Sequence, residues 1–258
     1  MASKSNLRIG WLGPSQPSSS HIKKFLNLVP ANVEVVYEQL ILHDGVLKDV
    51  QGKQDLIVSR AARFAERDKL DGLIFPGAPR EVWNPQLFEA FTAALKIPVA
   101  TALRASAAAL KTFATKRVLL LTPFDPELNQ LIREFLGQFD LTATSPSETL
   151  PHYTDALKMT TADVIAYARR AIAEQSQVDV IYFQGAVLDP MDCLEQMERE
   201  LNLPVVASNP AMNWYLLSKL GVKHPLAGFG KLLSSWPSLP TSPPIKPKLK
   251  SSTSNTRS

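Results

Sequence analysis

Two kinds of apolar pattern alternate along the first 233 residues. Short runs that are apolar throughout are typical of strands buried on both faces, and longer segments repeat apolar residues at helical spacing. The expected strands are 7–12, 33–37, 71–75, 97–100, 117–122, 141–145, 179–183 and 203–207. The expected helices are 21–28, 49–69, 85–95, 106–114, 127–139, 161–175, 191–201 and 209–220. This alternation predicts an α/β protein with mostly parallel sheets flanked by helices.

Three segments of the chain recur in the same order at nearly constant offsets. Residues 9–14, 71–78 and 98–100 resemble segments 109, 108 and 106 residues further on. We therefore predict two halves related by a pseudo-twofold axis. The first is 7–115, completed by the C-terminal segment, and the second is 116–233. A cleft should lie between them, because ligands of parallel α/β sheets bind at the carboxyl ends of the strands.

The formal net charge of +4 comes from the end of the chain. Segment 234–258 is rich in Pro, Ser and Lys and is expected to be a disordered basic tail. It holds four basic residues and no acid, which leaves 24 basic and 24 acidic residues in the rest of the chain. We expect no nucleic-acid partner, because a nucleic-acid binder carries its basic footprint on the fold. The tail is either a solubilising extension or a weak, salt-sensitive site for polyanions.

The cellular location follows from what the sequence does not contain. No apolar run approaches the roughly 20 residues of a membrane helix, and no signal-peptide pattern opens the chain. The single cysteine, Cys193, excludes an internal disulfide and fits a reducing compartment. We expect a cytoplasmic protein with no membrane partner. The four histidines lack zinc-site spacing, so we expect no metal and no cofactor.

Four motifs together resemble a known family over roughly residues 7–233. They are the opening Ile9–Ser15, VLLLTPFDPE at 118–127, LPVVASNPAMNW at 203–214 and GFGKLL at 228–233. The chain resembles the maleate isomerase and arylmalonate decarboxylase branch of the Asp/Glu racemase superfamily. This resemblance implies a cofactor-independent enzyme acting on a small-molecule substrate. A homodimer is compatible with it, although no residue of the sequence argues for one.

The resemblance also implies a catalytic cysteine in a loop of each half, and both are missing. Their positions align with Gly77 and Gly185, and the tyrosine of the family's TPY loop is replaced by Phe124. The family's Thr and Ser after the first cysteine become Ala78 and Pro79. A thiolate suits proton transfer beside a carboxylate, so its loss changes the chemistry available. Cys193 is expected inside the following helix as a buried structural thiol.

What remains at the cleft should be glycine backbone and aromatic walls. The expected wall residues are Trp11, Phe75, Trp83, Phe124 and Trp214. This composition favours a ligand that is larger and less charged than a small dicarboxylate. The expected substrate-binding residues are Ser15, Gly77, Ala78, Arg80, Thr122, Phe124, Gln184, Gly185, Ala186 and Asn209. The expected catalytic residues are Asp189 and His43.

Each candidate also has a purely structural interpretation. The two glycines can serve only to make tight turns, and Ser15 and Thr122 can satisfy local backbone groups. Arg80 and Glu81 can form an exposed ion pair, His43 can belong to a turn, and Asp189 can cap the helix that follows. His152 and Tyr153 lie in a linker that folds over the site in relatives, and they are either lid residues or simply exposed.

Three functions fit these observations. The first is a cofactor-independent isomerase, lyase or cyclase acting on an organic acid or a natural-product intermediate of secondary metabolism, without cysteine catalysis. The second is a racemase, maleate isomerase or decarboxylase that transfers protons on a small carboxylic acid by other residues. The third is a non-catalytic binding protein built on the same scaffold, since fold alone does not fix function.

Overall fold

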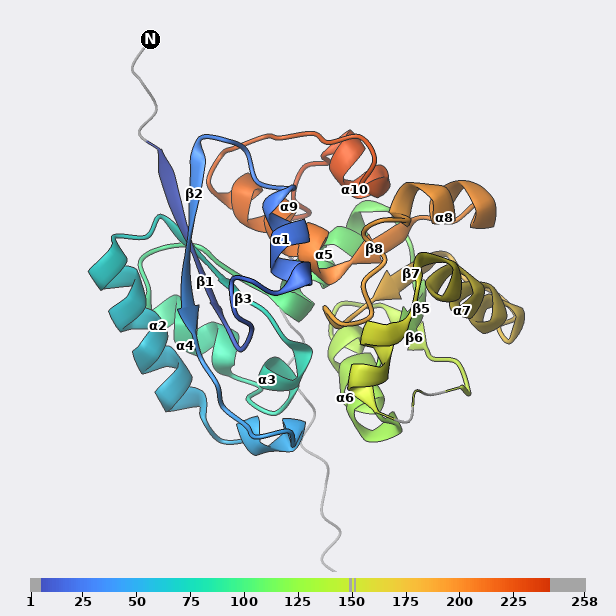
Figure 1. The fold of residues 1–258 in the computed structure, drawn as a ribbon, viewed down its shortest axis with the longest axis horizontal. Coiled ribbons are helices and arrows are strands. Elements are labelled where there is room, and N and C mark those ends of the chain that lie inside the picture. Colours follow the sequence, from blue (N-terminus) through green and yellow to red (C-terminus); the bar gives the residue numbers. More distant parts are fainter. Residues whose placement is uncertain (1–5, 149, 151, 242–258) are drawn as a thin grey trace, which may run out of the picture.

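The computed structural model describes residues 6–148, 150 and 152–241, and it contains two four-stranded parallel sheets. The first has the order β2-β1-β3-β4 and the second the order β6-β5-β7-β8, so the two halves share one topology (Figure 1). The first set of strands is β1 (Leu7–Gly13), β2 (Val33–Gln39), β3 (Gly72–Phe75) and β4 (Val99–Thr101). The second set is β5 (Arg117–Leu121), β6 (Thr142–Thr144), β7 (Val180–Phe183) and β8 (Val205–Ala207). The predicted fold class is confirmed.

Helices cover the sheets in both halves. The α-helices are α1 (Ser20–Leu26), α2 (Gln54–Asp68), α3 (Ala78–Val82), α4 (Leu87–Ala94), α5 (Ala102–Thr112), α6 (Pro126–Gly137), α7 (Thr161–Ala173), α8 (Leu194–Leu201), α9 (Ser208–Lys219) and α10 (Gly230–Ser235). Two short 3₁₀ helices are η1 (Leu47–Val50) and η2 (Tyr153–Lys158). Every strand predicted from the apolar runs is present; the central strands β3 and β7 are buried throughout, whereas β2 and β6 at the sheet edges are more exposed.

Three helix predictions need correction. The helix expected at 49–69 is divided into η1 and α2, with Gly52 between them at a φ of 70°. The short helix α3 was not expected, since its sequence contains Pro79 and follows Gly77; proline suits the first turn of a helix, where no backbone donor is lost. Helix α8 begins at Leu194, so Cys193 lies before it and not inside it.

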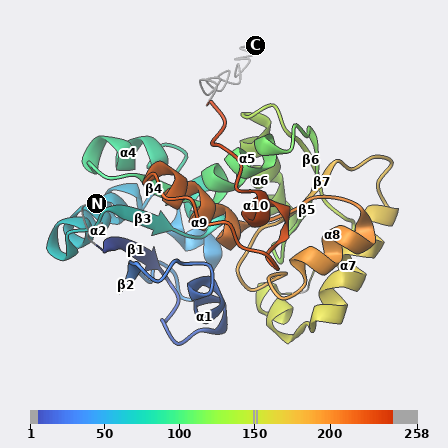
Figure 2. The same cartoon turned by 90° about the horizontal axis from the view of Figure 1, so that it is seen from above.

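Helix α9 connects the two halves. It follows β8 of the second sheet but packs against α5, β3 and β4 of the first half (Figures 1 and 2). The contact is close: a Cβ at Gly72 would lie 2.9 Å from Leu216 Cδ1. Asn213, on the same helix, is fully buried and donates from Nδ2 to the carbonyl of Leu28 at 2.9 Å. The C-terminal half of the chain therefore completes the core of the N-terminal half.

The ordered part of the chain continues beyond residue 233, where the tail was expected to begin. Ser234 and Ser235 belong to α10, and Trp236 is only 5% exposed. The indole Nε1 of Trp214 donates to the carbonyl of Pro237 at 3.0 Å. The expectation of disorder is therefore wrong for residues 234–237, and its part at 242–258 lies outside the described residues.

Polar side chains fix several helix ends. Thr160 is the N-cap of α7 and forms a capping box with Asp163, whose Oδ2 accepts from the Thr160 backbone at 2.8 Å. The Asp125 side chain caps α6 by accepting from Leu128 N at 2.8 Å.

Among residues 6–148, 150 and 152–241, no helix is both long and apolar enough to cross a membrane.

Candidate functional site

A cavity of about 300 Å³ lies where the loops at the carboxyl ends of both sheets meet, and we call it the central cavity. The first half contributes loops after β1, β2 and β3, and the second half contributes loops after β5, β7 and β8. It is lined by Trp11, Pro14, Ser15, His21, His43, Leu47, Val50, Pro76, Gly77, Pro79, Arg80, Phe124, Tyr153, Gln184, Gly185, Ala186, Val187, Ser208, Asn209 and Met212. This is the place where ligands bind in parallel α/β sheets.

Gly77 and Gly185 occupy equivalent places in the two halves, and both have backbone angles that favour glycine. Their φ values are 101° and 113°. A Cβ at Gly77 would meet nothing closer than Arg80 Cδ at 3.6 Å. A Cβ at Gly185 would lie 2.9 Å from Cδ of Pro123, which is closer than side chains approach one another in real structures. A cysteine at this position would therefore require the Pro123 ring to shift.

Arg80 carries a buried positive charge to the wall of the central cavity. It is 3% exposed, its Nη2 donates to the carbonyl of Leu40 at 3.1 Å, and its guanidinium lies 5.2 Å from the centre of the Phe75 ring. Within the described part of the chain, Nη1 has no hydrogen-bond partner and no carboxylate forms a salt bridge with Arg80. Burial lowers the pKa of Arg80 to about 10, so the group is still charged at neutral pH.

The exposed ion pair considered for Arg80 and Glu81 does not exist. Glu81 is 3% exposed and points towards α5, where its carboxylate accepts from Thr101 Oγ1 and from Leu103 N, each at 2.6 Å. Burial raises the pKa of Glu81 to about 7. The two neighbouring residues therefore have separate tasks: one faces the cavity, and the other caps the N-terminus of α5.

Three further buried polar atoms in the wall of the central cavity have no partner among the described residues. They are Trp11 Nε1, His43 Nδ1 and Asn209 Oδ1. A buried donor or acceptor left without a partner costs roughly 1–3 kcal/mol, so such groups are rare in folded proteins. Counting Arg80 Nη1, four such atoms belong to residues that line this one cavity.

Ser15 and His21 form a hydrogen-bonded pair at the same cavity. The Nε2 atom of His21 lies 2.8 Å from Ser15 Oγ. Burial lowers the pKa of His21, and the negative charge of Asp189 opposes this effect. His21 was not a sequence candidate, because a lone histidine at the start of a helix shows nothing of the hydroxyl that the fold brings next to it.

His43 also lines the central cavity, as expected for a candidate base. Burial lowers its pKa, and the nearby charge of Arg80 acts in the same direction. The adjacent Asp44 is exposed and is not part of the cavity wall. His43 is therefore available as a neutral imidazole, without an orienting carboxylate from its sequence neighbour.

Three expected site residues lie elsewhere. Ala78 is fully buried in the core below the loop. Thr122 donates its hydroxyl to Asn129 Oδ1 and accepts from Phe124 N at 3.0 Å, so it serves the local backbone. Asp189 lies outside the cavity wall, where Oδ2 is 3.0 Å from Lys24 Nζ and Oδ1 accepts from Met191 N at 3.0 Å. These contacts agree with the structural alternative considered for Thr122. Asp189 does not cap α8, whose N-cap is Cys193 without a side-chain cap hydrogen bond, and it holds the turn before the helix instead.

The walls differ from the aromatic set that was expected. Trp11 and Phe124 face the central cavity, whereas Phe75, Trp83 and Trp214 do not. Phe75 and Trp214 are instead buried inside the two hydrophobic cores. Tyr153 reaches the cavity from η2, but His152 does not. The remaining apolar lining includes Leu47 and Met212, which were not sequence candidates.

Cys193 is not placed for catalysis. It is 2% exposed, lies outside the central cavity, and its thiol donates weakly to the carbonyl of Pro190 at 3.4 Å. Burial raises the pKa of this thiol to about 11, which keeps it protonated at neutral pH. The sequence prediction of a buried thiol is correct.

In the ranges that the structure describes, no three His, Cys, Asp or Glu side chains gather as metal ligands.

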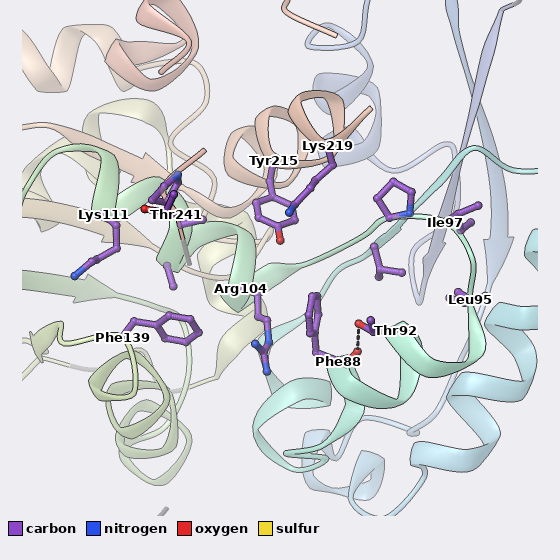
Figure 3. Close-up of a pocket in the computed structure, with 15 residues that line it drawn as sticks. Phe88, Thr92, Leu95, Ile97, Arg104, Lys111, Phe139, Tyr215, Lys219 and Thr241 are labelled. Atoms are coloured by element: carbon purple, nitrogen blue, oxygen red, sulfur yellow. Dashed lines mark hydrogen bonds between the residues drawn. The ribbon is translucent and has the colours of Figure 1, made fainter. Parts of the chain in front are cut away.

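A second, larger cavity of about 570 Å³ lies between α4, α5 and α9 (Figure 3). The guanidinium of Arg104 lies 4.1 Å from the centre of the Phe88 ring, with Phe139 on its other side, and it is paired with Glu89. Val99 in its wall is the first residue of β4, so this cavity lies towards the amino end of that strand. Its arginine is already neutralised, which makes the central cavity the better candidate.

Comparison with known proteins agrees with this geometry. The model of the arylmalonate decarboxylase family matches residues 78–233. The arylmalonate decarboxylase of Bordetella bronchiseptica is 27% identical over 133 residues, which make up 51% of this chain and 55% of that protein. The match therefore spans about half the length of this relative.

Solved structures extend the similarity to the whole fold. A structure of arylmalonate decarboxylase has a TM-score of 0.71 at 22% identity and covers 88% of this chain and 99% of its own. The maleate isomerase Iso from Pseudomonas putida S16 has a TM-score of 0.71 at 14% identity, with 90% and 99% covered. A Nocardia farcinica maleate cis-trans isomerase with a covalently bound succinylcysteine intermediate has a TM-score of 0.70 at 19% identity, with 89% and 98% covered. The chain belongs to the arylmalonate decarboxylase family, in the Asp/Glu racemase-like superfamily.

Proposed function

We propose that this protein is a cofactor-independent enzyme of the isomerase or lyase type that acts on an organic acid in the central cavity without cysteine catalysis. The observation that carries the proposal is Arg80, whose buried guanidinium lines the cavity and has no acidic partner among the described residues. An isolated buried charge is expensive, and an anionic ligand would remove that cost. A carboxylate is the natural partner of a guanidinium.

This proposal revises the expectation of a less charged ligand. The apolar walls remain, since Trp11, Phe124 and Met212 line the cavity. They would surround the organic body of the substrate while its carboxylate reaches Arg80. A volume of about 300 Å³ is at the lower end of ordinary ligand sites, which fits a small acid.

The chemistry follows from what a carboxylate does to its neighbouring carbon. When a proton or carbon dioxide leaves that carbon, negative charge spreads onto the carboxylate oxygens. A fixed cation and donors aimed at those oxygens stabilise the charge as it develops. Arg80 supplies the cation, and the indole Nε1 of Trp11, a residue of the cavity wall, is a donor without a partner among the described residues. The glycine backbone of the two loops allows close approach of a ligand.

Proton transfer must come from groups other than a thiol. Cys193 is the only cysteine of the sequence and lies outside the cavity. The cavity instead holds two histidines, His21 and His43, whose pKa values are both lowered by burial. Neutral imidazoles near neutral pH are suited to general acid–base catalysis.

The relatives support the substrate class. Arylmalonate decarboxylase and maleate isomerase are named for acids that carry two carboxyl groups. We propose that the substrate here, like those acids, carries at least one carboxylate next to the reacting carbon.

We also propose a cytoplasmic location, which is supported by a lone buried cysteine that cannot form an internal disulfide.

The test compares Arg80→Met with a matched control, Arg63→Met. Arg63 is exposed, so the control removes one positive charge without touching the cavity. Binding of a panel of carboxylic acids is measured by ligand-observed NMR, and turnover by deuterium incorporation from deuterated water.

We expect wild-type protein and the control to bind and exchange one class of acid, and Arg80→Met to lose at least about tenfold in affinity, because a hydrogen bond to a charged group contributes about 1.5–3 kcal/mol. Equal affinity in Arg80→Met would contradict the assignment of Arg80. Binding without exchange or conversion would favour the non-catalytic alternative.

A further inference from the structure

We propose that Ser15 and His21 are the proton-transfer pair of this enzyme, with Ser15 Oγ exchanging the proton at the substrate's α-carbon and His21 Nε2 accepting and returning the proton of Ser15. The inference rests on the proposed function and names the residues that do its chemistry. No sequence motif pointed to His21, and the pair is visible only in the fold.

The first argument is geometric. Ser15 lies in the turn after β1, and His21 is the second residue of α1, so both are at the carboxyl end of the first sheet. Their side chains are 2.8 Å apart, and both line the central cavity. A nucleophile or acid–base group within hydrogen-bond distance of its partner is the arrangement that activates a hydroxyl.

The second argument is that α1 is held firmly in place. Ile22 and Phe25, on the face of the helix opposite to solvent, are fully buried. The Phe25 ring packs on Trp11 with 4.6 Å between ring centres, and Trp11 itself lines the cavity. His21 is therefore carried on a helix whose buried face packs on β1 through Phe25 and Trp11.

The third argument concerns the charges that face His21. Asp189, from the loop between β7 and α8 of the second half, acts on His21 through its negative charge. Lys24, one turn further along α1, lies 3.0 Å from Asp189 and 2.6 Å from Asp192. Burial outweighs the charge of Asp189, so the pKa of His21 is lowered and the resting imidazole is neutral. Asp189 remains near enough to stabilise the imidazolium when it forms.

Asp189 thereby keeps a role, although it does not line the cavity. It acts through His21 and is a positioning residue, not the catalytic acid that the sequence suggested. This arrangement joins the two halves, because Ser15 and His21 come from the first half and Asp189 from the second.

The equivalent place in the second half has no such pair. The offset of the repeat places Phe124 where the first half has Ser15, and Phe124 lines the cavity with an aromatic ring. The hydroxyl nearest to it along the chain, that of Thr122, is bound to Asn129. Of the described residues that line the central cavity, Ser15 is the only hydroxyl hydrogen-bonded to a histidine.

The proton-transfer step balances without any further reagent. The α C–H bond breaks as its proton moves to Ser15 Oγ, and the proton of Ser15 moves to His21 Nε2. The electron pair of the C–H bond enters the enolate, whose oxygens carry the charge beside Arg80. The reverse step returns a proton to the carbon, and exchange of the imidazolium proton with solvent introduces deuterium. The substrate class is a carboxylic acid with an acidic α-hydrogen.

The test measures deuterium incorporation for wild type, Ser15→Ala, His21→Gln and the control Ser18→Ala, which lies exposed in the same loop. General acid–base catalysis contributes about 10²–10⁴-fold, so we expect Ser15→Ala and His21→Gln to lose at least 100-fold in exchange rate while binding the acid as before. Ser18→Ala should match wild type. Two-dimensional NMR spectra of each variant establish that it is folded.

Two further readouts separate catalysis from structure. Ser15→Cys keeps an acid–base group of similar size and should retain exchange well above that of Ser15→Ala, with a changed pH profile. In wild type the exchange rate should fall at acid pH as His21 becomes protonated, and this fall should disappear from the residual rate of His21→Gln.

The outcomes are distinct. If wild type exchanges the acid and both variants remain within threefold of it, the pair is not the proton-transfer group, and the proposed function stands. If wild type binds no carboxylic acid, or binds one without exchange or conversion, the proposed function fails and this inference with it.

Discussion

At the scale of single residues, the two loop glycines have similar backbone angles and different surroundings. Gly77 and Gly185 stand where the resemblance places cysteines, and both adopt φ values above 100°. Backbone of this kind costs a non-glycine residue about 1–3 kcal/mol. The repeat in the sequence predicted that these two glycines occupy equivalent places in the two halves. It could not predict that Gly185 faces Pro123, because that contact depends on the path of the neighbouring loop.

The difference between the glycines gives a stability prediction. Gly77→Ala should destabilise the protein by about 1–3 kcal/mol through backbone strain alone, since a Cβ there meets only ordinary contacts. Gly185→Ala should cost about 1–3 kcal/mol more, because its Cβ also collides with the Pro123 ring. Urea unfolding of both variants measures the difference. Equal free energies of unfolding would show that the second loop relaxes freely.

The same scale shows where sequence reasoning reached its limit at the site. Arg80 and His43 were candidates, and both line the central cavity. His21 lines the cavity without having been a candidate, and Asp189 was expected at the cavity, whereas its side chain turns to Lys24. Residue type and position after a strand end predict which loops meet. They do not determine which way a side chain points within its loop.

At the scale of elements, the short helix α3 links the cavity to the core. Arg80 and Glu81 are adjacent in it, yet one faces the cavity and the other caps α5 through Leu103 N at 2.6 Å. The N-cap residue of α5, Thr101, makes no side-chain cap hydrogen bond of its own. A cap from another helix leaves no local sequence pattern, which is why neither α3 nor this contact was expected.

This buried cap makes stability depend on pH. The pKa of Glu81 is raised from 4.5 to about 7, so between these values the folded state binds more protons than the unfolded state. The free energy of unfolding contributed by Glu81 therefore falls as pH rises from 4.5 to about 7, by roughly 2–4 kcal/mol. The Glu81→Gln side chain keeps an oxygen that can accept from Leu103 N and an amide that can hydrogen-bond to Thr101 Oγ1, but it cannot ionise.

We expect urea unfolding at pH 5 and pH 7.5 to show that Glu81→Gln gains stability relative to wild type as pH rises. The difference in unfolding free energy between the two proteins should change in that direction across the window. A difference that is the same at both pH values would show that Glu81 does not titrate within it.

At the scale of the whole molecule, two sheets of the same topology carry different loops at their carboxyl ends. The repeat offsets and apolar runs were sufficient to predict the two sheets, because each half encodes the same strand order. They predicted that the C-terminal segment completes the first half, but they could not show the close contact between Gly72 and Leu216 through which α9 packs there, since these residues are far apart in sequence. They also missed the buried Trp236, which lies in a stretch whose Pro and Ser content is typical of disorder.

The central claim is that this member of the family carries out acid–base chemistry on an organic acid without a thiol. The most direct measurement is deuterium incorporation into the bound acid by the Cys193→Ala variant, which contains no cysteine at all. We predict an exchange rate within about threefold of wild type, because Cys193 lies outside the cavity and burial raises its thiol pKa to about 11. Loss of exchange in a variant that remains folded and still binds the acid would contradict the account.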